Sequence, residues 1–249
     1  MTGNPMRIAM WSGPRNLSTA LMYAFAARGD CVVWDEPFYA AYLAATGIDH
    51  PMRDEVIAAG LRNPADFAAR CLGPGPKGNP LFYQKHMTLH MIPSFDREFL
   101  GGLTNVFLIR HPARVLASYT RKRESPTLAD LGFVQQAELF DAVCQLRGTA
   151  PLVIDSADIR ADPQGALSGL CAALGIGFCP AMLRWSAGPK PYDGVWAAHW
   201  YNAVHASTGF ENPEETLPVL HAKNVALVDQ AMPHYQRLSA HSLGRPTQN

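Results

Sequence analysis

The chain has 249 residues, and its 21 basic and 21 acidic side chains give a formal net charge of zero. A zero balance argues against loose electrostatic binding to nucleic acid or to an anionic membrane, because neither gains much from such a surface. Apolar residues make up 48% of the chain, which excludes disorder for the bulk of it. We expect one domain over residues 1–243 and a frayed tail at 244–249.

The five cysteines form no CxxC pair, and their number is odd. This usage argues against a disulfide framework or a zinc site and fits a reducing cytoplasm best. The N-terminus has no basic stretch followed by an apolar one, so we expect no signal peptide. No run of about 18 apolar residues occurs, so we expect no membrane span.

Short apolar runs alternate with helical patterns along the chain. In order, the patterns predict a strand at 7–11, a helix at 17–28, a strand at 31–34, helices near 53–61 and 64–72, strands at 81–84 and 105–109, a helix from Pro112, a helix at 134–147, a strand at 152–154, and helices at 162–174, 196–207 and 222–238. Short, continuously apolar strands are typical of parallel sheets, because helices cover both faces. The pattern predicts an α/β three-layer sandwich with a central, mainly parallel sheet. In such folds ligands bind beyond the carboxyl ends of the strands.

The segment after the first strand has the composition of an anion-binding loop. It leads into a helix and reads Ser12, Gly13, Pro14, Arg15, Asn16, Leu17, Ser18 and Thr19. Backbone N–H groups at a helix N-terminus bind phosphate, and an arginine can hold two oxygens of one phosphate or sulfate. The match to the P-loop GxxxxGK[ST] is partial, because the Gly-Lys pair is missing. The alternative is an ordinary helix N-terminus with a surface arginine.

A second candidate element follows the strand at 105–109. Arg110 leaves the sheet at its carboxyl end, and Ser118 lies two helical turns further on, on the same side. A strand-end arginine seldom lacks an anionic partner, so the alternative is a pairing with a core acid such as Asp35. Two such elements at neighbouring strand ends suit a ligand with two separated phosphate groups.

With these two elements the sequence resembles the sulfotransferases that use 3′-phosphoadenosine 5′-phosphosulfate, which have a P-loop NTPase-like fold. The segment from Pro14 to Thr19 resembles the family's PKSGTTW loop, which grips the 5′-phosphosulfate. Arg110 and Ser118, eight residues apart, match its RNPxDxxxSxY element, which grips the 3′-phosphate. Residues 158–163 resemble its EDxxxDP stretch, and residues 84–90 resemble its KTHLPLH stretch, whose first histidine is the catalytic base. The resemblance covers about residues 6–175 and is closest to small bacterial-type relatives.

Several positions depart from the family pattern. Arg15 replaces a lysine, Leu17 replaces a glycine, and Ala20 replaces the tryptophan that stacks on adenine. Lys85 stands one residue closer to His86 than the family's lysine does. Lys190 only loosely matches the late basic segment that also binds the 3′-phosphate.

Sulfuryl transfer needs a base for the acceptor's proton and cations for the oxygens that gain charge. We predict Arg15 as a catalytic cation, and either His86 or Glu36 as the base; a glutamate before proline serves as base in some bacterial sulfotransferases that act on sugars. The alternatives are a core histidine at 86, and salt bridges from Asp35 or Glu36 to Arg15 or Arg110. We expect no metal, since position 87 is methionine and no HExxH motif occurs around His86 and His90.

The resemblance implies 3′-phosphoadenosine 5′-phosphosulfate as co-substrate and a small-molecule acceptor. The aromatic residues at 193–201, with His205, Tyr39 and Tyr42, suit a sugar or another small hydroxylated acceptor, unless they only pack on the sheet. The alternative functions are a P-loop kinase-like phosphotransferase, which would need the missing Gly-Lys-Ser/Thr triplet, and a nucleotide-binding relative without turnover.

Overall fold

The central element of the fold is a five-stranded parallel sheet, seen in a computed structural model that describes residues 4–75, 78–121, 125–210, 213 and 216–244. The strand order is β2-β3-β1-β4-β5, and every neighbouring pair runs parallel. The strands are β1 (Met6–Ser12), β2 (Cys31–Asp35), β3 (Leu81–Met87), β4 (Thr104–Ile109) and β5 (Leu152–Asp155). This confirms the predicted parallel α/β sheet.

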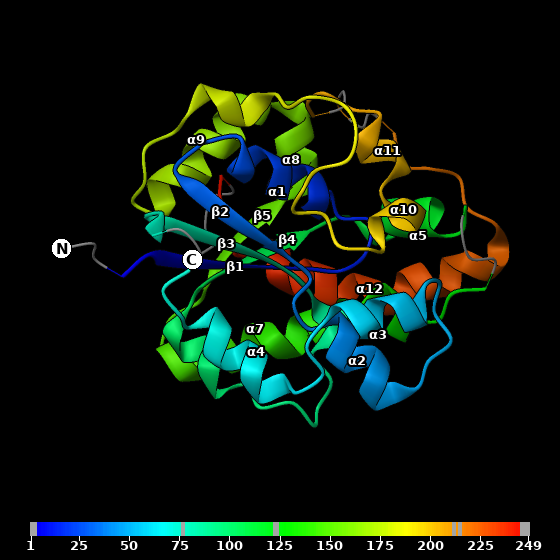
Figure 1. Cartoon of the computed structure of the whole chain (residues 1–249). Coiled ribbons are helices and arrows are strands. Elements are labelled where there is room, and N and C mark those ends of the chain that lie inside the picture. Colours follow the sequence, from blue (N-terminus) through cyan, green and yellow to red (C-terminus); the bar gives the residue numbers. More distant parts are fainter. Residues whose placement is uncertain (1–3, 76–77, 122–124, 211–212, 214–215, 245–249) are drawn as a thin grey trace.

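Helices cover both faces of the sheet, which gives the three layers (Figure 1). One face carries α1 (Ser18–Ala26), α8 (Ser156–Ala161) and α9 (Pro163–Ala173), and the other carries α4 (Pro64–Cys71), α5 (Pro112–Tyr119), α7 (Phe133–Arg147) and α12 (Ala222–Ser239). Side chains of a strand alternate between faces. Accordingly, Ile8 and Met10 of β1 pack with the first set, and Ala9 and Trp11 pack with the second.

Shorter helices gather near the carboxyl ends of the strands. They are α2 (Tyr39–Thr46), α3 (Arg53–Ala59), α6 (Leu128–Leu131), α10 (Ala197–Trp200) and α11 (Asn202–His205), with a 3₁₀ turn at Thr88–His90. Two further 3₁₀ turns lie elsewhere, at Glu98–Gly102 directly before β4 and at Pro180–Leu183 against α1 and α9. Helices α2, α3 and α10 form a small apolar cluster of their own, in which Tyr39, Leu43, Val56, Trp196 and Tyr201 are buried. This cluster forms one wall of the site described below.

Three differences from the sequence prediction change the surroundings of the site, and the short helices α6 and α8 were not predicted either. Strand β3 extends to Met87, because Lys85, His86 and Met87 continue the pairing with β1 although two of them are polar. Helix α2 was not predicted, since its apolar residues lie on all sides and give no clear periodicity. The helix predicted at 196–207 is two short helices that meet at Tyr201, the residue whose side chain turns into the site.

All five cysteines are unpaired thiols. Among the described residues no helix is both long and apolar enough to cross a bilayer. Of the tail predicted at 244–249, residues 245–249 lie outside the described residues.

Candidate active site

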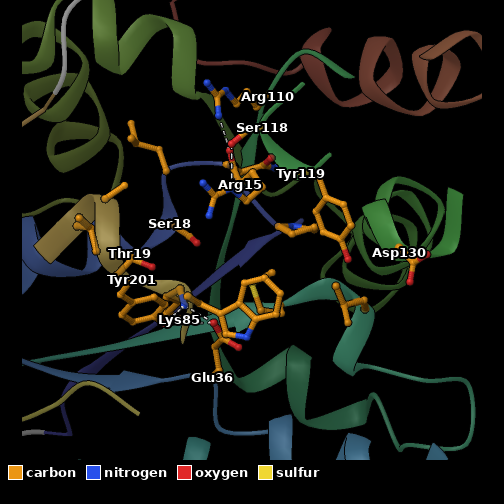
Figure 2. A pocket seen from close by; sticks show the side chains of 18 of the residues that line it. Arg15, Ser18, Thr19, Glu36, Lys85, Arg110, Ser118, Tyr119, Asp130 and Tyr201 are labelled. Atoms are coloured by element: carbon orange, nitrogen blue, oxygen red, sulfur yellow. Dashed lines mark hydrogen bonds and ion pairs between the residues drawn. The ribbon is translucent and has the colours of Figure 1, made fainter. Parts of the chain in front are cut away.

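A cavity of about 730 Å³ opens where the strands end. Its walls include the segment that follows β1, residues at the ends of β2 and β3, and helices α2, α5, α8, α10 and α11. Figure 2 shows Arg110 and Ser118 at one end of this cavity, Glu36, Lys85 and Tyr201 at the other, and Arg15 between them. The site therefore lies where parallel α/β folds place their ligands.

The loop after β1 holds an unusual backbone shape. Arg15 has φ 62° and Leu17 has φ 73°, both in the left-handed region that costs a non-glycine residue roughly 1–2 kcal/mol. Leu17 thus adopts the conformation that the glycine of the family's loop would adopt freely. A Cβ on Gly13 would lie 2.8 Å from the Leu131 carbonyl oxygen, so the loop packs closely against α6. The replacement of glycine by leucine has therefore not changed the loop to an ordinary turn.

The two predicted anion-binding elements are joined directly. Arg15 Nε donates a hydrogen bond to Ser118 Oγ at 2.9 Å, and Arg110 Nη1 donates to the Arg15 carbonyl oxygen at 2.6 Å. Asn16 is buried and donates from Nδ2 to the Leu108 carbonyl oxygen at 3.1 Å, which fixes the loop to the end of β4. The structure thus brings Arg15, Arg110 and Ser118 into one wall of the cavity.

At the opposite end, two carboxylates surround one buried lysine. Lys85 Nζ contacts Asp35 Oδ1 at 2.9 Å and also bonds Glu36 Oε1, and all three side chains are buried. The Tyr201 hydroxyl accepts from Lys85 Nζ at 2.6 Å and lies 2.8 Å from Asp35 Oδ2. The partner of Glu36 is therefore Lys85, and not Arg15 or Arg110 as in the alternative considered above.

The charges in this cluster stabilise one another. Burial raises the pKa of Glu36, and the positive charge of Lys85 offsets only part of that rise. For Lys85, burial lowers the pKa, but the charges of Asp35 and Glu36 outweigh it, so its pKa is raised and it stays a cation. The result is a carboxylate in the cavity wall with a higher proton affinity than an exposed glutamate.

His86 lies within β3, so the expectation that it follows the strand is wrong. Alternation along the strand points Lys85 and Met87 toward the cavity and turns His86 to the other face. There its ring stacks on Trp11 at 4.2 Å, and Nε2 lies 3.2 Å from Gln84 Oε1. Burial lowers the pKa of His86 to about 3. The structure does not bring His86 to the cavity lining with Glu36.

His90 is the histidine of this stretch that lines the cavity. It ends the 3₁₀ turn Thr88–His90, and its Nδ1 lies 4.0 Å from Glu36 Oε2. Its ring stacks on Tyr39 at 4.4 Å and on Tyr42 at 5.0 Å. Sequence reasoning treated His90 only as half of a metal pair. The signal that could have found it is its position after β3, where alternation ends and a turn redirects the side chain into the cavity.

Comparison with known proteins shows the family to which the chain belongs. The family model described as sulfotransferase domain matches residues 6–242. The chain belongs to this sulfotransferase family. A relative from Arabidopsis thaliana, described as branched-chain-amino-acid aminotransferase-like protein 1, is 40% identical over 240 residues. That match covers 95% of this chain but 42% of the relative, so the chain spans less than half of the relative's length.

Two solved sulfotransferase structures share the fold. A sulfotransferase from Alicyclobacillus acidocaldarius superposes with a TM-score of 0.54 at 12% identity, over 94% of each chain. The sulfotransferase domain of an olefin synthase from Synechococcus PCC 7002 gives a TM-score of 0.50 at 18% identity, over 91% of this chain and 94% of that one. At these identities the likeness supports the P-loop NTPase-like sulfotransferase fold and no finer property.

Further cations of this sulfotransferase-family chain line the same cavity, namely Arg114, Arg121 and Arg160. Arg160 belongs to α8, within the stretch that resembles the family's EDxxxDP motif. Lys190, the loose match to the late basic segment, instead closes its own turn: Nζ donates to the carbonyl oxygens of Ser186 at 2.7 Å and Gly188 at 3.0 Å. The basic wall therefore comes from the loop after β1, from α5 with the residues at its two ends, and from α8, and not from the segment around Lys190.

The predicted acceptor wall is assembled in part. Tyr39, Tyr42, Trp200 and Tyr201 line the cavity. By contrast Trp196 is buried in the small apolar cluster, and His205 Nε2 is held by Asp193 at 3.0 Å, so both support the wall from behind. Among the described residues there is no group of three or more His, Cys, Asp or Glu side chains that could hold a metal ion.

Proposed function

We propose that this chain transfers a sulfuryl group from 3′-phosphoadenosine 5′-phosphosulfate to a hydroxyl or amine of a small acceptor. The observation that carries the proposal is the direct contact between the two predicted anion-binding elements, the loop after β1 and the segment from Arg110 to Ser118. Arg15 contacts Ser118 at 2.9 Å, and Arg110 contacts the backbone of Arg15 at 2.6 Å, in a cavity that a buried carboxylate also enters. This arrangement offers two anion positions and one base.

The donor would occupy the end of the cavity that carries the arginines. The backbone N–H groups at the start of α1, with Ser18 and Thr19, suit the 5′-phosphosulfate, because a helix N-terminus attracts negative charge. Arg110 and Ser118 suit the 3′-phosphate. Arg15 lies between the labelled side chains of Ser18 and Ser118 (Figure 2), so its guanidinium would be able to neutralise the charge that develops on the leaving phosphate oxygen.

Glu36 is the base that the geometry favours over His86. The carboxylate lines the cavity and its pKa is raised, whereas His86 faces the other side of the sheet and stays neutral. In the transfer, an acceptor oxygen or nitrogen attacks sulfur while Glu36 takes its proton. The bond from sulfur to the phosphate oxygen breaks, and adenosine 3′,5′-bisphosphate leaves. Lys85 stays charged and holds Glu36 in place.

The donor site is tested by calorimetric titration with adenosine 3′,5′-bisphosphate in the absence of metal, compared with ATP and magnesium. We expect the bisphosphate to bind, and Arg110→Ala to weaken that binding about tenfold or more, since a charge-assisted contact contributes roughly 1.5–3 kcal/mol. Arg62→Ala is the matched control, because Arg62 is exposed and outside the cavity lining. Binding of ATP alone would contradict the proposal and favour a kinase.

The same preparations test turnover. Release of the bisphosphate from the phosphosulfate donor is measured with a panel of alcohols, sugars, phenols and amines. Glu36→Gln should bind the bisphosphate like the wild type but turn over at least about a hundredfold more slowly, the usual contribution of a general base. Binding without turnover in the wild type, for every acceptor class, would indicate a nucleotide-binding relative instead.

A further inference from the structure

Glu36 presents its two carboxylate oxygens to different partners. Oε1 bonds Lys85 Nζ, and the Tyr201 hydroxyl lies 3.2 Å from the same oxygen. Oε2 faces His90, whose Nδ1 is 4.0 Å away. Because Lys85 is a cation that occupies Oε1, a proton arriving at this carboxylate is directed to Oε2. The oxygen that can act as base is therefore the one next to His90.

The ring of His90 is held in a fixed orientation. Tyr39 and Tyr42, one turn apart on α2, stack on it with interplanar angles of 10° and 27°. Tyr39 is itself tied to the His50 ring through its hydroxyl. His90 Nδ1 is buried and has no hydrogen-bond partner among the described residues, although a buried polar atom normally has one. A nitrogen that is oriented, buried and unpaired beside Oε2 is placed to accept a hydrogen bond that forms only when Oε2 is protonated.

We propose that His90 is a positioning residue for the base, and that its Nδ1 accepts a hydrogen bond from the Glu36 carboxyl once Glu36 has taken the acceptor's proton. This inference rests on the sulfuryl transfer proposed above and names a further residue for it. Nδ1 needs a free lone pair for this role. Burial holds the pKa of His90 well below its usual range, with the nearby positive charge of Lys85 acting in the same direction, so the ring is neutral.

The proton balance of the step is simple. The acceptor's O–H or N–H bond breaks, the new bond to sulfur forms, and the bond from sulfur to the phosphate oxygen breaks. The proton goes to Glu36 Oε2, and its hydrogen bond to Nδ1 lowers the free energy of the protonated carboxyl. Hydrogen bonding to the neutral form raises the pKa of an acid, so His90 makes Glu36 a stronger base. After product release the proton leaves to solvent in the cavity.

Two variants separate this role from packing. His90→Phe keeps a ring between the tyrosines but removes Nδ1, whereas His90→Asn places an amide oxygen near the Nδ1 position. His221→Asn is the control, since His221 is exposed and outside the cavity lining. We expect His90→Phe to lower kcat about tenfold or more, as part of what a general base contributes. We expect His90→Asn to recover most of that loss, with bisphosphate affinity unchanged in both.

The pH profile supplies a readout that a packing role would not move. Without Nδ1 the pKa of Glu36 falls, so the acid limb of kcat/KM should shift to lower pH while the plateau drops. The charged and titratable groups around the pair, Asp35, Lys85, Tyr201, His50 and the two stacking tyrosines, are the same in every variant. If the pH profile of kcat/KM in His90→Phe has the same plateau and the same acid limb as the wild type, the inference is overturned and the proposed sulfuryl transfer is unaffected.

A measurement without turnover keeps the inference independent of the acceptor. The ¹⁵N signals of the histidine rings are followed against pH, with His90 assigned by its loss in His90→Asn. We expect the Nδ1 signal to shift as Glu36 titrates, and the shift to vanish in Glu36→Gln. A Nδ1 signal that ignores Glu36 would overturn the inference whether or not the protein transfers sulfuryl groups. Failure of bisphosphate binding would count against the proposed function alone.

Discussion

At the scale of single residues, His86 serves the fold and not the cavity. Its ring is buried against Trp11, and burial lowers its pKa to about 3. An unfolded histidine takes up a proton near pH 6.5. Between these two values the unfolded chain binds a proton at this position that the folded chain does not bind. The free energy of unfolding is therefore not reduced by His86 above about pH 6.5, and it falls as the pH drops below that value.

This difference gives a measurable slope. Between about pH 6 and pH 4, His86 contributes up to roughly 1.4 kcal/mol of unfolding free energy per pH unit. In urea titrations, His86→Gln should flatten the pH dependence by about 1 kcal/mol per unit, whatever its effect on overall stability. The exposed His221, replaced by glutamine, is the control and should leave the slope as it is. An unchanged slope in His86→Gln would show that His86 is not a buried neutral ring.

At the scale of elements, the sequence is enough to predict the five strands but not how far β3 extends at its carboxyl end. All five strands were found from short apolar runs, since a strand covered on both faces carries that pattern. β3, however, continues through Lys85 and His86, because pairing with β1 and the ion pair to Asp35 outweigh their polarity. That extension decides which side chain meets the cavity. The predicted Arg15, Arg110 and Ser118 do meet, because turns after neighbouring parallel strands lie side by side.

The loop after β1 and helix α6 depend on each other for close packing. A methyl group on Gly13 would lie 2.8 Å from the Leu131 carbonyl oxygen, which is backbone and cannot rotate away. We expect Gly13→Ala to lower the unfolding free energy by about 1–3 kcal/mol, as overpacking does, and to weaken bisphosphate binding by moving the loop. Chemical denaturation and calorimetry measure the two effects.

The matched control for this change is Gly169→Ala. Gly169 lies in α9, and no atom of the described residues stands within 4 Å of the position its Cβ would take. Alanine is the better helix former there, so a gain of about 0.5–1 kcal/mol is expected, without any change in ligand affinity. Should Gly13→Ala prove as stable as the wild type and bind equally well, the loop and α6 are not closely packed.

At the scale of the whole molecule, the net charge is zero, but positive and negative side chains are concentrated at opposite ends of the cavity. Among the described residues, five arginines line the cavity, namely Arg15, Arg110, Arg114, Arg121 and Arg160, whereas Asp35, Glu36 and Lys85 lie together at its other end. Because its net charge is zero, the molecule as a whole has no excess positive charge to attract an anionic nucleotide from a distance. Any attraction must come from the field of the arginines inside the cavity, which acts over about a Debye length.

This separation predicts how ligand binding responds to salt. When ionic strength rises from about 0.05 M to about 0.5 M, the association rate of the bisphosphate should fall about tenfold, because the local field is screened. The dissociation rate should change less, since contacts inside the cavity are partly shielded from ions. Stopped-flow measurements with a fluorescent bisphosphate analogue give both rates. Arg160→Ala should flatten the salt dependence of association, and Arg62→Ala, on the exposed surface, should not. Equal slopes in the two variants would mean that the arginines of the cavity do not attract the ligand.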